Sequence, residues 1–379
     1  MLRRARLVTC WFVTLLALPA CSATGTSDLI ATGDDGGGAG DDGATATDDS
    51  APANGATDSG TGATTDTGGT NTGSSGVSVI VEPNGNRGAE LVDAIQAART
   101  SVHVTMYLLS SSEVINALIA AHGAGVDVKV ILNQTFPSSG TNNSSSYSQL
   151  QGAGIPVVWA SSSFTYTHEK CAIIDGATAW IMTMNATYSA PIDNREYLAV
   201  DTTPADVAEA EQIFAADFAQ TAISPSGPLV VAPVNAKPDI VAVIDGAQHT
   251  LDMEAEEFSD IDVTHAVAQA AQRGVAVRLV MANDSGNTIG SNSSLGTVKS
   301  AGARVYSSGG TAGSSTASAP YIHAKVAVAD GARCYLGSEN FTTGSLKYNR
   351  ELGVVLTNAS EIAKITSTIN ADVAKGTAL

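Results

Sequence analysis

The sequence has few basic residues, few aromatic residues and few cysteines. Its 37 Asp and Glu against 19 Lys and Arg give a formal net charge of −18. An acidic surface repels the phosphate backbone of nucleic acids. This charge therefore disfavours a function that depends on electrostatic binding of nucleic acid. Aromatic residues make up only 5% of the chain, but 44% of it is hydrophobic, which is enough for a globular core.

Two of the four cysteines, Cys171 and Cys334, lie in apolar runs well inside the chain. They occupy different places in the duplicated pattern described below, so we expect buried free thiols rather than a disulfide. Beyond the N-terminus, no apolar run is long enough to span a bilayer.

Residues 1–20 have the layout of a secretory signal peptide, with a basic start and a short apolar run. The run ends in Leu18-Pro19-Ala20-Cys21, which resembles the lipobox of bacterial lipoproteins. This resemblance implies lipidation of Cys21 and a membrane-anchored, extracytoplasmic protein of the cell envelope or cell surface.

Residues 21–77 are mostly Gly, Ser, Thr, Ala and Asp. Such a segment buries too little apolar surface to offset its ordering entropy, so we expect a disordered linker after the lipidated cysteine. The remaining length suits two fused halves. We place the first half at 78–222 and the second at 223–379.

One pattern occurs twice in the chain. Tyr166–Asp175 and Tyr321–Asp330 each contain histidine, any residue, lysine, four further residues and aspartate. An asparagine and then an Asn-Arg-Glu triplet follow each copy at matched distances, at Asn185 and Asn194–Glu196 and at Asn340 and Asn349–Glu351. The near-constant offset indicates an internal duplication, and one site built from two related halves explains it most simply.

Helical and strand patterns alternate in the same order in both halves. The predicted segments are helix 89–98, strand 101–107, helix 112–121 and strand 126–132, then helix 240–247, strand 250–255, helix 263–272 and strand 275–281. The pattern predicts an α/β fold with two similar halves, each a mixed β-sheet flanked by helices, packed about a pseudo-two-fold axis.

Each copy places its histidine and lysine two residues apart on a predicted strand, so both side chains should point to one face. Two facing imidazoles suit a two-step displacement in which one attacks and the other protonates the leaving group. Lysine and asparagine side chains would hold the oxygens of a phosphoryl group, and a carboxylate on each imidazole would fix its tautomer.

The paired pattern resembles the phospholipase D superfamily, whose signature is His-x-Lys, four residues, Asp, six residues, Gly-Ser-x-Asn. The second copy matches throughout, at His323, Lys325, Asp330, Gly337, Ser338 and Asn340. The first copy matches at His168, Lys170, Asp175 and Asn185, and has Met182 and Thr183 in place of Gly and Ser. Glu196 and Glu351 match a recurring family position at which an acid supports a catalytic histidine.

The resemblance implies a metal-independent phosphodiesterase without a cofactor that works through a phosphohistidine. It makes His168 the nucleophile and His323 the proton donor, a choice that the symmetry of the two copies leaves open. Phosphate would be bound by Lys170, Lys325, Asn185, Asn340, Thr183 and Ser338. Glu196 and Glu351 would orient the imidazoles. Asp175 and Asp330 complete the catalytic set, and we expect them to support the strands and turns rather than proton chemistry.

A lipid-anchored, acidic protein favours a phospholipid head-group ester as substrate, and an alcohol replacing water would give transphosphatidylation. The alternatives are a superfamily endonuclease, a phosphatidyl transferase such as a cardiolipin synthase, and a catalytically weak phosphate- or lipid-binding protein. The last rests on Met182, which we expect to add bulk near the phosphate pocket. Nucleic acid is the less favoured partner, and a monomer suffices because one chain supplies both motifs.

Overall fold

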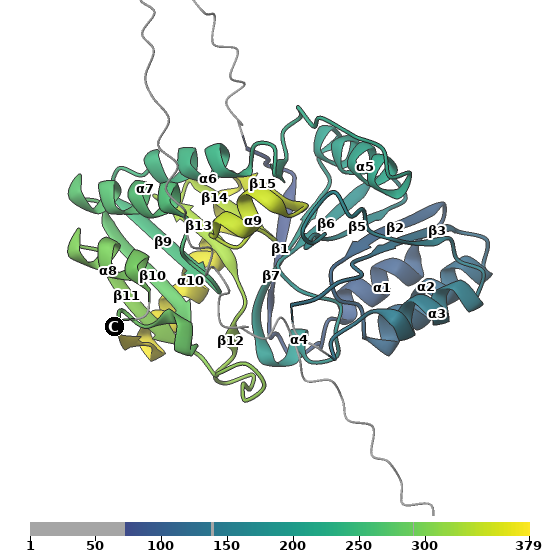
Figure 1. Cartoon of the computed structure of the whole chain (residues 1–379), viewed down its shortest axis with the longest axis horizontal. Coiled ribbons are helices and arrows are strands. Elements are labelled where there is room, and N and C mark those ends of the chain that lie inside the picture. Colours follow the sequence, from purple (N-terminus) through teal and green to yellow (C-terminus); the bar gives the residue numbers. More distant parts are fainter. Residues whose placement is uncertain (1–72, 138–139, 291) are drawn as a thin grey trace, which may run out of the picture. The chain divides into compact units, whose positions relative to one another are not determined.

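The computed structural model describes residues 73–137, 140–290 and 292–379 (Figure 1). The predicted signal peptide, Cys21 and nearly all of the predicted linker lie outside these residues. Ser74, which precedes the predicted start of the first half, exchanges backbone hydrogen bonds with Val355 and Thr357. None of the described helices combines the length and apolar content needed to cross a membrane.

The predicted order of helices and strands is confirmed in both halves. The first half contains β1 (Val77–Glu82), α1 (Ala89–Ala97), β2 (Ser101–Met106), α2 (Ser112–Gly123), β3 (Asp127–Leu132), α3 (Ser144–Gly152), β4 (Val157–Trp159), β5 (Lys170–Ile174), β6 (Thr178–Met182), α4 (Ala190–Asp193), β7 (Asn194–Asp201) and α5 (Pro204–Phe218). Helix α2 begins where its pattern predicts, because the Ser111 side chain accepts the free N–H of Val114 at its first turn.

The second half repeats this order. It contains β8 (Val230–Ala232), α6 (Ala236–Asp245), β9 (Thr250–Ala255), α7 (Ile261–Gln272), β10 (Ala276–Ala282), the 3₁₀ turn η1 (Ser285–Asn287), α8 (Ser293–Ser300), β11 (Arg304–Ser308), β12 (Tyr321–Ile322), β13 (Lys325–Ala329), β14 (Arg333–Gly337), α9 (Thr343–Tyr348), β15 (Glu351–Leu356), α10 (Ala359–Lys375) and β16 (Thr377–Ala378).

The strands form two mixed sheets with equivalent strand orders. The first sheet runs β1-β7-β6-β5-β2-β3-β4, and the second runs β8-β15-β14-β13-β9-β10-β11-β16. Strands β2, β3 and β4 of the first sheet run parallel, as do β9, β10 and β11 of the second. The motif strands β5 and β13 pair antiparallel with both of their neighbours. The predicted α/β fold of two similar halves is therefore confirmed.

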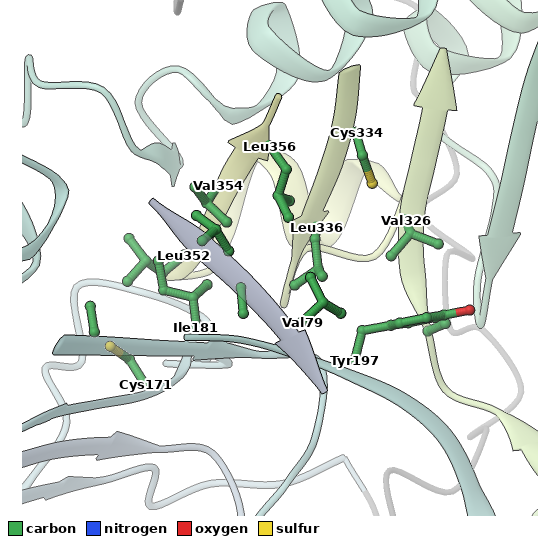
Figure 2. Packing of buried hydrophobic residues seen from close by; sticks show 14 of the residues in the cluster. Val79, Cys171, Ile181, Tyr197, Val326, Cys334, Leu336, Leu352, Val354 and Leu356 are labelled. Carbon is green, nitrogen blue, oxygen red and sulfur yellow. The ribbon is translucent and has the colours of Figure 1, made fainter. Parts of the chain in front are cut away.

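Alternation along the motif strands divides the interior into three cores. On β13, Val326 and Val328 face a core shared by both halves, and Ala327 and Ala329 face the core of the second half. Figure 2 shows this shared core, in which β-strand side chains of the two halves meet. Cys171 and Cys334 both lie in it as buried free thiols, as predicted.

The segment before each motif strand pairs with the Asn-Arg-Glu segment of the other half. Strand β12 runs parallel to β7, with Tyr321 beside Asn194 and Ile322 beside Arg195. In the mirror arrangement Thr167 bridges Arg350. These short pairings carry the two motif histidines to the boundary between the halves.

The arginines of the two triplets form buried ion pairs with helices of the opposite half. Arg195 Nε lies 2.7 Å from Asp372 on α10, and Arg350 Nε lies 2.8 Å from Asp217 on α5. Each pair joins residues more than one hundred positions apart in the sequence. The two halves are therefore fixed to one another next to the motif residues.

Candidate active site

Each motif histidine lies two residues before its strand begins. The backbone N–H of His168 donates to Arg350 of the other half at 2.9 Å, which places the imidazole at the boundary between halves. His323 follows β12 in the same way. The residue His168 is 6% exposed and His323 is 0% exposed, so water has little access to either imidazole.

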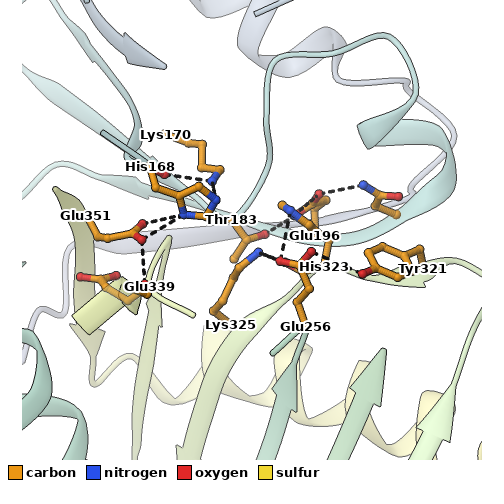
Figure 3. Close-up of polar contacts among 12 residues, drawn as sticks. His168, Lys170, Thr183, Glu196, Glu256, Tyr321, His323, Lys325, Glu339 and Glu351 are labelled. Carbon is orange, nitrogen blue, oxygen red and sulfur yellow. Dashed lines mark hydrogen bonds and ion pairs between the residues drawn. The ribbon is translucent and has the colours of Figure 1, made fainter. Parts of the chain in front are cut away.

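Each imidazole is bound by the triplet glutamate of the opposite half (Figure 3). His168 Nδ1 lies 2.9 and 3.0 Å from the two carboxylate oxygens of Glu351. His323 Nδ1 lies 2.8 Å from Glu196 Oε1. The predicted histidine–glutamate pairs are thus present, and their crossed arrangement was not specified by the sequence.

The asparagine of each triplet holds the glutamate two residues later. Asn194 Nδ2 donates to Glu196 and Asn349 Nδ2 donates to Glu351, both at 3.2 Å. Ser345 adds a 2.7 Å bond to Glu351. Because these carboxylates are fully buried, such donors are needed to keep them at a fixed orientation.

The Glu351 carboxylate is held in its charged form. Burial alone would raise its pKa, but the contacts with His168, Lys170 and Ser345 outweigh burial and hold the pKa of Glu351 below its usual value. A charged glutamate accepts a hydrogen bond, so Nδ1 of His168 is the protonated ring nitrogen.

The two lysines lie beside their histidines, as predicted, but have different partners. Lys170 Nζ donates to Nε2 of His168 at 2.7 Å and also lies 4.9 Å from the ring centre of Tyr107. Lys325 Nζ instead donates to Glu256 at 2.7 Å. Both lysines bond the carbonyl of their own histidine, at 2.9 and 2.8 Å, which keeps each ammonium in the site.

Tyr107 and Glu256 are site residues that the sequence prediction missed. They occupy equivalent positions, because each directly follows the central strand of its half and donates its backbone N–H to the residue after the motif histidine, Glu169 or Ala324. The Tyr107 ring lies edge-on to His168 with ring centres 4.5 Å apart. The duplication itself was the available signal, since both residues have the same offset as the surrounding helices and strands.

The four remaining phosphate-binding candidates are buried near the histidine–glutamate pairs. The Thr183 hydroxyl donates to Glu196 and accepts the N–H of Tyr197 at 2.9 Å. Ser338 accepts the N–H of Leu352 at 3.1 Å, the equivalent bond in the second half. Both hydroxyls therefore bond to the protein itself. Asn185 and Asn340 are 0% and 8% exposed.

Asp175 and Asp330 lie at the far ends of the motif strands from the histidines. Each adopts a positive φ, 57° and 54°, and accepts backbone N–H groups from the loop before the central strand. These hydrogen bonds outweigh the opposing effect of desolvation and lower the pKa of both carboxyls. Seven residues of extended chain span roughly 23 Å, so these aspartates support turns and do not reach the imidazoles.

Comparison with known proteins identifies the family of this chain. A family model described as "Cardiolipin synthase, PLD-like domain" matches residues 91–218 and 240–373. The chain belongs to the phospholipase D-like family. It is 29% identical over 126 residues to a protein from Danio rerio named mitochondrial cardiolipin hydrolase, and the match covers 33% of this chain. It covers 54% of that relative, about half of its length.

Two solved structures share the fold over 80% of this chain. Phosphatidylserine synthase from Haemophilus influenzae superposes with a TM-score of 0.59 at 12% identity and is covered over 87% of its length. Polyphosphate kinase from Porphyromonas gingivalis superposes with a TM-score of 0.61 at 15% identity and is covered over 48%. At these identities the likeness shows the phospholipase D-like fold.

The expected position of Met182 is wrong. Its side chain is fully buried in the core of the first half, together with Ala172, Met184 and Leu198. Successive residues of a strand point to opposite faces, so Met182 points away from the face that carries Thr183. Met182 therefore adds no bulk on the strand face that carries Thr183.

Gly337 is the counterpart of Met182 in the second half, and the space beside it holds the neutral carboxyl of Glu339. Gly337 and Gly353 pair across two strands and leave room for Tyr335, whose hydroxyl donates to Glu339 at 2.6 Å. Burial, reinforced by Glu351, raises the pKa of Glu339 well above its usual value. Burial likewise raises the pKa of Glu169 to about 8.

A small cavity of about 60 Å³ opens beside the site, and its lining includes Asn194 and Tyr321. The hydroxyl of Tyr321 donates to Glu256, which also binds Lys325, so Tyr321 connects the cavity lining to this ion pair. Within residues 73–137, 140–290 and 292–379, no group of three or more His, Cys, Asp or Glu side chains is arranged to hold a metal ion.

Proposed function

We propose that this phospholipase D-like protein is a phosphodiesterase that releases the head group of a phospholipid through a phosphohistidine intermediate. The observation that carries the proposal is the pair of crossed contacts, His168 with Glu351 and His323 with Glu196. Two oriented imidazoles beside two lysines supply a nucleophile, a proton donor and charge for the phosphoryl oxygens.

In the first step, the lone pair on Nε2 of His168 forms a bond to phosphorus. The bond from phosphorus to the leaving oxygen breaks, and its electron pair stays on that oxygen. The oxygen takes the Nε2 proton of His323 and departs as an alcohol. Lys170 and Lys325 balance the charge on the remaining phosphoryl oxygens. The assignment of attack to His168 follows the family resemblance.

In the second step, neutral His323 takes a proton from water as the water oxygen bonds to phosphorus. The phosphorus–nitrogen bond breaks, and its electron pair returns to Nε2 of His168. An alcohol in place of water would give transphosphatidylation by the same proton transfers. Glu196 and Glu351 keep the two rings oriented through both steps.

The substrate proposal rests on charge and on similarity. The net charge of −18 opposes binding of a nucleic-acid backbone. The Danio rerio relative carries the name of a cardiolipin hydrolase, so its named substrate class is a phospholipid. We also propose lipid attachment at Cys21 and a place in the cell envelope outside the cytoplasm, because the first 21 residues have the lipoprotein pattern.

The test uses the full chain with phosphatidylcholine, phosphatidylethanolamine and cardiolipin vesicles, with single-stranded and duplex DNA as parallel substrates. Chelator is present throughout. We expect head-group release by the wild type and its loss in His168→Ala and His323→Ala. His265→Ala is the matched control, because His265 is an exposed residue of α7.

An acid-labile phosphatidyl group on the quenched wild type, absent from His168→Ala, would identify the phosphohistidine. DNA cleavage without lipid turnover would overturn the lipid substrate and retain the phosphodiesterase. Activity that survives in both histidine variants would overturn the proposed site.

A further inference from the structure

One of the differences between the two halves lies beside the motif histidines, where the first half has Tyr107 and the second has Glu256. Both residues follow the central strand of their half and make the same backbone hydrogen bond. The first brings an uncharged ring against His168 and Lys170. The second brings a carboxylate against His323 and Lys325. At this position the two halves of the site therefore differ in charge.

The surroundings of Nε2 are opposite in the two imidazoles. Nε2 of His168 receives a hydrogen bond from the Lys170 ammonium at 2.7 Å, and an ammonium has only donors. This nitrogen therefore carries a lone pair. The proton of the ring is on Nδ1, which donates a hydrogen bond to Glu351. A lone pair on Nε2 is what attack on phosphorus requires.

Nε2 of His323 faces an acceptor instead. Glu256 Oε2 lies 3.4 Å away, while Glu196 binds Nδ1 of the same ring at 2.8 Å. An imidazole between two carboxylates is favoured in its doubly protonated form. A proton on Nε2 is what protonation of the leaving oxygen requires.

Glu256 is held firmly in this position. Lys325 Nζ donates to its Oε2 at 2.7 Å, and the Tyr321 hydroxyl donates to its Oε1 at 3.4 Å. Its residue is 3% exposed, so the carboxylate is weakly screened by water. Figure 3 shows His323, Lys325 and Tyr321 around this carboxylate. Tyr321 and Glu196 also lie beside the His323 ring, and Lys325 lies beside Glu256 and the His323 carbonyl.

We propose that Glu256 is a positioning residue that keeps a proton on Nε2 of His323 and so makes His323 the general acid, while Tyr107 leaves His168 as the nucleophile. The same contact ties up the Lys325 ammonium until a substrate phosphate displaces it. This division of roles rests on the proposed phosphodiester cleavage, but the protonation states are properties of the resting protein and are measurable without a substrate.

The deciding experiment is nitrogen-15 NMR of the histidine rings across pH in the full-length wild type, Glu256→Gln and Glu257→Gln. The signals are assigned with His168→Ala and His323→Ala. Glu257 is the matched control, because it is the adjacent glutamate and is exposed. We expect His323 to lose its Nε2 proton about one pH unit lower in Glu256→Gln than in the wild type, because removal of a nearby opposite charge shifts such a titration by 1–3 units. His168 should titrate alike in all three proteins.

An unchanged His323 titration in Glu256→Gln, or a wild-type His323 that carries a single proton at neutral pH, would overturn the proposal. A His323 shift in a protein without phosphodiesterase activity would support the proton assignment and contradict the proposed function. The two failures are thus distinguishable.

Kinetics then separate positioning from simple damage. With an alkyl leaving group, the alkaline limb of the pH–rate profile should move about one pH unit lower in Glu256→Gln. The rate at pH values above that limb should then fall about tenfold. A nitrophenyl leaving group needs no proton, so its release should change little. Equal losses with both leaving groups and an unmoved alkaline limb would show a structural role and overturn the proposal. Recovery of the limb in Glu256→Asp would support it.

Discussion

Glu196 of the first half lies 2.8 Å from Nδ1 of His323 of the second half. The mirror contact, Glu351 with His168, is 2.9 Å long. Each imidazole therefore lies against a carboxylate that comes from the other half, so the proposed nucleophile and the proposed proton donor have separate supports. This separation gives the first prediction.

Glu196→Gln should slow the release of an alkyl leaving group by about 10²–10⁴-fold, because loss of an orienting carboxylate affects the general acid directly. With bis(4-nitrophenyl) phosphate, the first step needs no proton and only the hydrolysis by water is slowed. We therefore expect a burst of nitrophenol and accumulated phosphohistidine. Glu351→Gln should slow attack itself and show no burst. Rapid-quench measurements with both substrates check this, and a burst in Glu351→Gln alone would contradict the crossed assignment.

Arg195→Met should lower the free energy of unfolding by about 3–5 kcal/mol, because it leaves Asp372 as a buried carboxylate without its partner. The ion pair is 2.7 Å long and both side chains are nearly buried. Lys129→Met is the matched control, because its pair with Asp127 is exposed and should contribute less than about 1 kcal/mol. Urea unfolding of the three proteins measures both values. Similar losses of unfolding free energy in Arg195→Met and Lys129→Met would contradict a larger contribution from the ion pair between the halves.

Glu169→Gln should make stability less dependent on pH between about 5 and 8. Burial, then the Asp217 carboxylate, raises the pKa of Glu169 from 4.5 to about 8. In that window the folded chain holds a proton that the unfolded chain has lost, so the free energy of unfolding falls as pH rises. The slope approaches about 1.4 kcal/mol per pH unit for one proton.

The glutamine variant removes this proton difference, so its unfolding free energy should fall more gently than that of the wild type. Urea titrations at pH 5, 6.5 and 8 measure the slopes. Glu257→Gln, at an exposed glutamate, should keep the wild-type slope. Parallel curves for the wild type and Glu169→Gln would contradict the raised pKa.

Gly353→Ala should destabilise the protein by about 1–3 kcal/mol, the usual cost of overpacking a core. A Cβ at this position would lie 2.7 Å from the Tyr335 ring and 2.9 Å from Glu339. Gly344→Ala is the control, because the nearest atom to its added Cβ is 3.9 Å away and the residue lies in α9. Thermal unfolding should separate the two variants, with Gly344→Ala at or above the wild-type midpoint.

Periodicity and internal repetition allowed much of the fold to be predicted. The boundaries of β2, β3, β9 and β10 lie within one residue of the predicted strands. These signals are local, since each depends on apolar spacing within one segment. The burial of Cys171 and Cys334 followed from the same local patterns.

The errors concern direction and distant partners. Met182 and Ala172 lie in the same core because of how β5 pairs with β6, and no motif position indicates that shared face. The crossed glutamates depend on how two halves pack, and no local pattern encodes that. Glu256 lies outside both copies of the motif, so no motif position marks it as part of the site, although it is 3% exposed.

The crossed glutamates also constrain how the repeats can diverge. A substitution at Glu196 acts on the histidine of the other repeat, and a substitution at Glu351 does the same in return. In genetic terms, variants at Glu196 and His323 should share one phenotype although they lie in different repeats. The two repeats are therefore constrained together, because each supplies the glutamate that contacts the histidine of the other.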